Sequence, residues 1–156
     1  MQVIAALDVI EALLRASAHP DFQNIGRYGA DTAAGGSSPP GVKVTHQSGS
    51  ATMIWATAAK PEAATVALPP EMPPPPQRVQ RMVSFAVQLF DAARPAAFTT
   101  WEPCKYPGVH ISPAGLRITA SDGSKIHLRV TNAAGAAREP DKDPHPDYQF
   151  PAEVRS

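Results

Sequence analysis

The chain has only one cysteine, Cys104, among its 156 residues. No internal disulfide can therefore form. A domain of this length buries roughly two-thirds of its unfolded surface, so it can be stable without a disulfide. We expect a reducing location, which is either the cytoplasm or a virion-associated position.

Long apolar runs are also absent. No stretch approaches the ~20 apolar residues of a membrane-spanning helix. The first eighteen residues are largely apolar but include Asp8, Glu11 and Arg15, which is atypical of the apolar core of a signal peptide. We therefore expect no membrane partner.

Net charge is lacking as well, because 14 Lys and Arg balance 14 Asp and Glu. Catalytic and cofactor motifs are missing: there is no Walker loop, G-x-G-x-x-G, C-x-x-C, H-E-x-x-H or G-x-S-x-G. We expect no cofactor, no metal and no catalytic residue, and we favour a protein that is not an enzyme.

Two amphipathic helices are predicted over residues 2–17 and 78–93. In the first, Val3, Leu7, Ile10 and Leu14 form one apolar stripe. Each helix stops before an X-Pro pair, because the residue before proline is pushed out of the helical region. In the second, the side chains expected to face outward are Gln80, Ser84, Gln88 and Asp91.

Residues 41–57 and 115–131 carry almost the same pattern. Both have two alternating runs around a Gly-Ser turn, which is typical of a β-hairpin. Each hairpin follows a predicted helix, so the pattern indicates a tandem α-β-β repeat or, alternatively, convergence on a simple motif. Without a gap, the identical pairs are Gly41/Gly115, Thr45/Thr119, Gly49/Gly123, Ser50/Ser124 and Thr57/Thr131.

These elements predict an α+β fold with two helices packed on a mainly antiparallel sheet. We divide the single compact domain into a first α-β-β unit at 1–60, a Pro-rich linker or arm at 61–77, a second unit at 78–132, and an extended or disordered tail at 133–156. Residues 24–41 are predicted to be a loop. Short strands are expected at Thr65–Leu68 and Phe98–Trp101.

Four basic side chains share the outward face of the second hairpin: Arg117, Lys125, His127 and Arg129. Such a basic strip can contact phosphates or another anionic partner. A solvated sheet face is the alternative that we favour, because the chain is neutral overall and no aromatic residues alternate with the charges. The acidic tail is a further candidate to lie against the strip.

Cys104 and His110 share an irregular Pro-rich segment. An imidazole beside a thiol can act as the base that activates a cysteine nucleophile. Cys104 is therefore a candidate reactive thiol, with His110 as its partner. A lone buried thiol is the favoured alternative, because no cysteine-hydrolase signature surrounds it.

The stretch VTHQSGSATMIW followed by ATVALPP resembles the HicA family of small ribonuclease toxins. The resemblance implies a scaffold like that of double-stranded-RNA-binding domains. Ala51 follows Gly49 and Ser50 where the family has its catalytic histidine, so the resemblance implies binding without cleavage.

We expect a non-catalytic structural or interaction subunit of a larger assembly, such as a phage virion or connector component, with a protein partner or self-association. The expectation rests on the absent catalytic motifs, the neutral charge and the Pro-rich arms. A small nucleic-acid-binding regulator and a small Cys/His enzyme are the alternatives.

Overall fold

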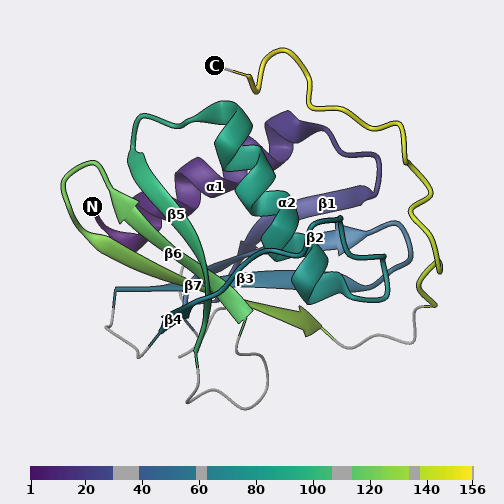
Figure 1. Ribbon diagram of the computed structural model, residues 1–156, viewed down its shortest axis with the longest axis horizontal. Helices are drawn as coiled ribbons and strands as arrows, with labels where there is room; N and C mark the ends of the chain where they lie inside the picture. Colours follow the sequence, from purple (N-terminus) through teal and green to yellow (C-terminus); the bar gives the residue numbers. More distant parts are fainter. Residues whose placement is uncertain (30–38, 59–62, 107–113, 134–137, 156) are drawn as a thin grey trace.

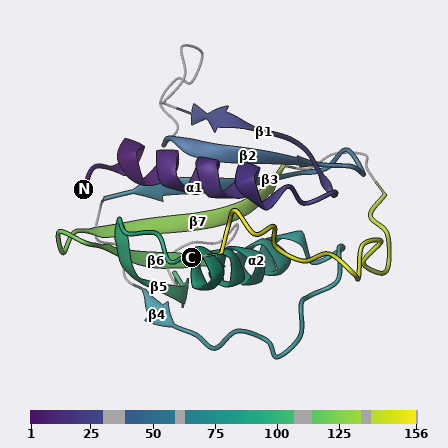
Figure 2. The same ribbon diagram turned by 90° about the horizontal axis from the view of Figure 1, so that it is seen from above.

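The computed structural model describes residues 1–29, 39–58, 63–106, 114–133 and 138–155. Its strands form one antiparallel sheet in the order β1-β2-β3-β7-β6-β5-β4. Both helices lie on the same face of this sheet, as Figures 1 and 2 show, which confirms the predicted α+β fold. The elements are α1 (Val3–Ser17), β1 (Phe22–Tyr28), β2 (Gly41–His46), β3 (Ala51–Thr57), β4 (Ala64–Thr65), α2 (Arg78–Ala93), β5 (Phe98–Lys105), β6 (Ala114–Ala120) and β7 (Lys125–Ala133).

The core lies between the helices and the sheet, as the apolar periodicity predicts. α1 covers β1–β3 and α2 covers β5–β7. Leu7, Ile10 and Leu14 of α1 are buried, and so are Ile118 and Ile126 of the second hairpin. Burial of such side chains is the main favourable term in folding. None of the described helices is long and apolar enough to cross a membrane.

The two helices end in the same way. Each is closed by a residue in the left-handed conformation, Ala18 (φ 48°) and Arg94 (φ 45°), whose N–H bonds back to the last turn. This conformation is uncommon outside glycine and satisfies a carbonyl left free at a helix end. It also turns the chain back toward the sheet.

The two hairpins are matched as well. Gly49 and Gly123 have φ values of 94° and 88°, which only glycine adopts at little cost. In both turns, the residue that ends the first strand donates its N–H to the serine carbonyl after the glycine, at 2.8 Å. The Gly-Ser pattern therefore predicted both turns correctly.

The prediction of a loop over 24–41 is wrong at its start, because residues 22–28 form β1 at an edge of the sheet. The strand has weak alternation, since Ile25 is its buried apolar side chain and polar neighbours fill the exposed positions. The strand expected at Thr65–Leu68 is shorter and earlier, at Ala64–Thr65, and Phe98–Trp101 extends to Lys105.

Two segments without regular structure cover the outer side of α2. Residues 66–77 pass on the side of α2 away from α1, and the C-terminal segment crosses its other flank (Figure 2). Leu68, Met72, Tyr148 and Phe150 pack against the core from these segments. As a result Ser84, predicted to face solvent, is buried.

Candidate functional site

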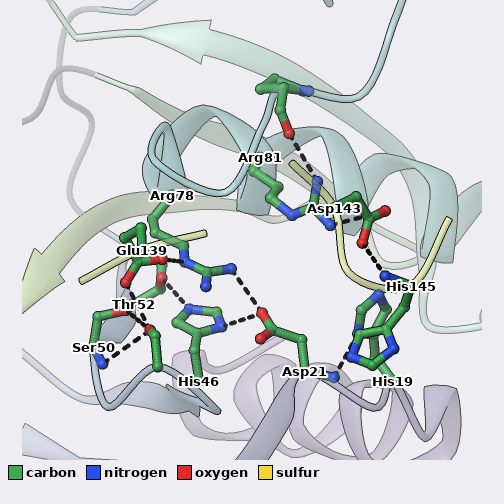
Figure 3. A network of polar contacts seen from close by, with 12 residues as sticks. His19, Asp21, His46, Ser50, Thr52, Arg78, Arg81, Glu139, Asp143 and His145 are labelled. Carbon is green, nitrogen blue, oxygen red and sulfur yellow. Dashed lines mark hydrogen bonds and ion pairs between the residues drawn. The ribbon is translucent and has the colours of Figure 1, made fainter. Parts of the chain in front are cut away.

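A cluster of polar side chains lies where the end of α1, the first hairpin, the start of α2 and the C-terminal segment meet. Figure 3 shows these side chains pointing toward one another. Most of them are buried, although polar groups are seldom buried without partners. The cluster consists of His19, Asp21, His46, Thr52, Arg78 and Glu139.

Arg78 is the centre of the cluster. Its guanidinium donates through Nη1 to Asp21 Oδ2 at 2.7 Å and through Nε to Glu139 Oε2. The side chain is only 3% exposed and sits in the first turn of α2, where the helix dipole opposes a cation. The two carboxylates therefore make this position tolerable for a buried charge.

The carboxylates are held ionised by the same contacts. Burial alone raises the pKa of Asp21, but the hydrogen bond from His46 and the charge of Arg78 outweigh it and hold the pKa below its usual value. Burial likewise raises the pKa of Glu139, and hydrogen bonds from Ser50 and Ser48 together with Arg78 lower it overall. The cluster is thus an ionised network at neutral pH.

His46 connects the network to the sheet. Its Nδ1 lies 3.1 Å from Asp21 Oδ2, and its Nε2 lies 2.7 Å from Thr52 Oγ1. This order of carboxylate, imidazole and hydroxyl is that of a hydrolase triad. However, Thr52 is completely buried in β3, so a substrate cannot reach its hydroxyl in this structure. The three groups therefore hold the hairpin to the loop after α1.

His19 is a neutral ring with a defined tautomer. The backbone N–H of Asp21 donates to Nδ1 at 3.0 Å, which places the proton of the neutral ring on Nε2. Burial is the main cause that lowers the pKa of His19 to about 4. The ring packs against Tyr148 and Phe22, with centroids 4.3 and 5.0 Å away.

A cavity of about 200 Å³ adjoins these groups. Its walls combine apolar side chains, mainly aromatic, with the polar groups just described. The C-terminal segment closes one side of it. Its walls include Met72, Phe85 and Phe150, together with His19, Arg78 and Tyr148.

The C-terminal segment is anchored by its own side chains. Asp143 pairs with Arg81 of α2 at 3.3 Å, Tyr148 donates its hydroxyl to the carbonyl of Ser17, and Val154 is buried. Burial raises the pKa of Asp143, but its hydrogen bond from the backbone of residue 145 and the charge of Arg81 lower it overall. The acidic tail thus lies against α2 and not against the basic strip.

The basic strip is on the face of the sheet opposite the helices, as predicted, but its four side chains differ in burial and in their partners. His127 is buried, with Tyr106 Oη 3.5 Å from its Nδ1, and burial followed by Arg117 and Lys125 lowers its pKa. Arg117 pairs with Glu102 at 3.2 Å, and Lys125 donates to a threonine hydroxyl at 2.6 Å. The Nε of Arg129 is buried without a partner among the described residues.

Cys104 lies on β5 and is 2% exposed. Its thiol lies 3.3 Å from the carbonyl of Glu102, and burial is the main cause that raises its pKa. A buried thiol with a raised pKa is a poor nucleophile. His110 falls outside the described residues, and within those residues no group of His, Cys, Asp or Glu could hold a metal ion.

Sequence reasoning missed the cluster because its members come from five separate segments. One signal was present: Arg78 and Arg81 are one turn apart on α2, and the tail offers acidic residues that can pair with them.

Comparisons of the chain with family models, with curated proteins and with solved structures find no match.

Proposed function

We propose that this chain is a non-catalytic interaction subunit of a larger protein assembly. The observation that carries the proposal is the C-terminal arm, residues 138–155, which has no helix or strand (Figure 1). It is attached through a few specific side chains. Its anchors are the ion pairs to Arg78 and Arg81, the Tyr148 hydroxyl and the buried Val154.

Such an arm makes the same contacts whether it docks on its own body or on a second copy. Exchange of an identical element between copies is a low-cost route to oligomers. A phage virion or connector component is one concrete form of the proposal, by analogy with assemblies that use extended arms.

Light scattering after size exclusion, over a range of concentrations, tests the proposal. We expect a mass that grows to a multiple of the chain, and a shift toward monomer in Asp143→Asn with Tyr148→Phe. Asp147→Asn, an exposed arm position, is the matched control and should behave as the wild type. A strict monomer that captures no partner protein from its native source overturns the proposal.

The other two candidate functions receive less support. A nucleic-acid-binding strip needs free basic side chains, whereas Arg117 is paired and His127 is buried. An enzyme based on Cys104 needs an accessible thiol. The segment that resembles HicA toxins does not form a separate sheet, because β4 joins β5 at the far edge.

We also infer that the two halves arose by duplication of a unit with one helix and three strands. The support is the shared pattern of 41–57 and 115–131, together with the matched helix ends and turns. Related chains whose halves align at the same offsets with higher identity would strengthen the inference, and loss of the pattern in such chains would remove it.

A further inference from the structure

The cavity beneath the arm has the size of a small ring compound. Its volume is about 200 Å³. An apolar cavity of roughly 150 Å³ is known to bind benzene. Phe85, Phe150 and Met72 line it from three different segments, and the His19 and Tyr148 rings complete an aromatic wall. Aromatic side chains around a cavity favour a flat ring, through offset or edge-to-face contacts.

Two hydrogen-bond donors of the cavity wall bond to none of the described residues. Nε2–H of His19 is the one open to a ligand, because the other ring nitrogen already accepts from the backbone of Asp21 and Nε2 is not fully buried. Nη2 of Arg78 is fully buried and is therefore closed to a ligand in the cavity. A ligand that brings an oxygen acceptor would satisfy the donor of His19.

The charges at the cavity are already paired. Arg78 contacts two carboxylates, Asp21 and Glu139, and Arg81 contacts Asp143. These five groups sum to one net negative charge. An anionic ligand would therefore be repelled, and a cationic ligand without an oxygen offers no acceptor to His19.

We propose that this cavity binds a small uncharged aromatic compound with a carbonyl or amide oxygen that accepts from His19 Nε2. The ring lies among Phe85, Tyr148 and Phe150, and the oxygen points toward His19. The site does not depend on the proposed arm exchange, because the arm closes the cavity in either arrangement.

Three probes of nearly equal size and different charge test this site: benzamide, benzoate and benzylamine. Calorimetry with the full chain at neutral pH should show saturable binding of benzamide, about tenfold or more tighter than the other two. Equal or tighter binding of benzoate or benzylamine overturns the charge argument. Absence of benzamide binding overturns the site.

A cavity-filling variant separates this site from other surfaces. Met72→Trp places a large ring in the cavity and should abolish benzamide binding. Val66→Trp, at an exposed position of the same segment, is the matched control and should leave binding intact. If Met72→Trp does not fold, Met72→Ala enlarges the cavity and should shift the preference toward two-ring naphthamide. Unchanged preference in that variant overturns the proposal.

Discussion

The two halves of the molecule share a backbone arrangement and differ in chemistry at one end. Gln47 donates its N–H to the carbonyl of Asp21 at 2.9 Å, and Ser121 makes the matching bond to Ala97 at 2.8 Å. Where the first half has polar side chains, the second has apolar ones. The matched positions are His19 and Pro95, Asp21 and Ala97, His46 and Ala120, and Thr52 and Ile126.

The difference shows that the fold does not require polar residues at these positions. The second half closes its helix end and hairpin with the same backbone bonds, although its four matched positions carry no charge. In the first half the polar residues meet Arg78 and the C-terminal arm. The cluster therefore connects the first half to α2 and to the arm, in addition to holding its own hairpin.

The largest expected effect follows from removing the centre of the cluster. Arg78→Met leaves the buried Asp21 and the half-buried Glu139 without their cation, and should lower the free energy of unfolding by about 3–5 kcal/mol. Urea denaturation measures the change. Arg15→Met, in an exposed ion pair with Glu11, is the control and should lose less than about 1 kcal/mol. Equal effects of the two variants would show that the cluster contributes nothing special.

The next effect is a pH dependence that His19 contributes in the first half. The pKa of His19 is lowered from 6.5 to about 4, mainly by burial, so the unfolded chain binds a proton that the folded chain does not. The contribution of His19 to the free energy of unfolding is complete above pH 6.5. It falls by about 3 kcal/mol as the pH drops to about 4.

Denaturation of the wild type and of His19→Asn at both ends of this range tests the prediction. The asparagine keeps an acceptor for the backbone of Asp21 but does not titrate. Its stability should depend less on pH by most of that amount, and a slope equal to that of the wild type would contradict the assignment.

A smaller effect compares two matched glycines where strands approach closely. A Cβ at Gly41 would lie 2.6 Å from the carbonyl oxygen of Ile54, and one at Gly115 would lie 1.8 Å from that of Leu128. Gly115→Ala should therefore destabilise by about 3 kcal/mol and Gly41→Ala by about 1–2 kcal/mol. Thermal unfolding of both variants gives the order, and a reversed order would contradict the geometry.

The smallest effect concerns the hairpin turns, where the halves should respond alike. Gly49→Ala and Gly123→Ala each force a side chain into a left-handed conformation and should lose about 1 kcal/mol. Chemical denaturation should give values within about 0.5 kcal/mol of each other. A clear difference would mean that one turn has contacts that the other lacks.

Much of the fold was predictable because it depends on local patterns. The apolar stripe of α1, the alternation of β6 and β7 and the glycine turns all follow from spacing along the chain. β1 was missed, because Ile25 is its one buried apolar side chain and an edge strand needs little alternation. The burial of Ser84 was missed, because segments distant in the sequence cover α2.

The sequence by itself determined the class of fold, the positions of the helices and hairpins, and the equivalence of the two turns. The reason is that periodicity and glycine conformations act within a few residues. Only the tertiary structure decided that Asp21, Arg78 and Glu139 meet, that Thr52 is out of reach and that a cavity lies beneath the arm. These features arise from contacts between residues far apart in the chain, whose partners no local pattern specifies.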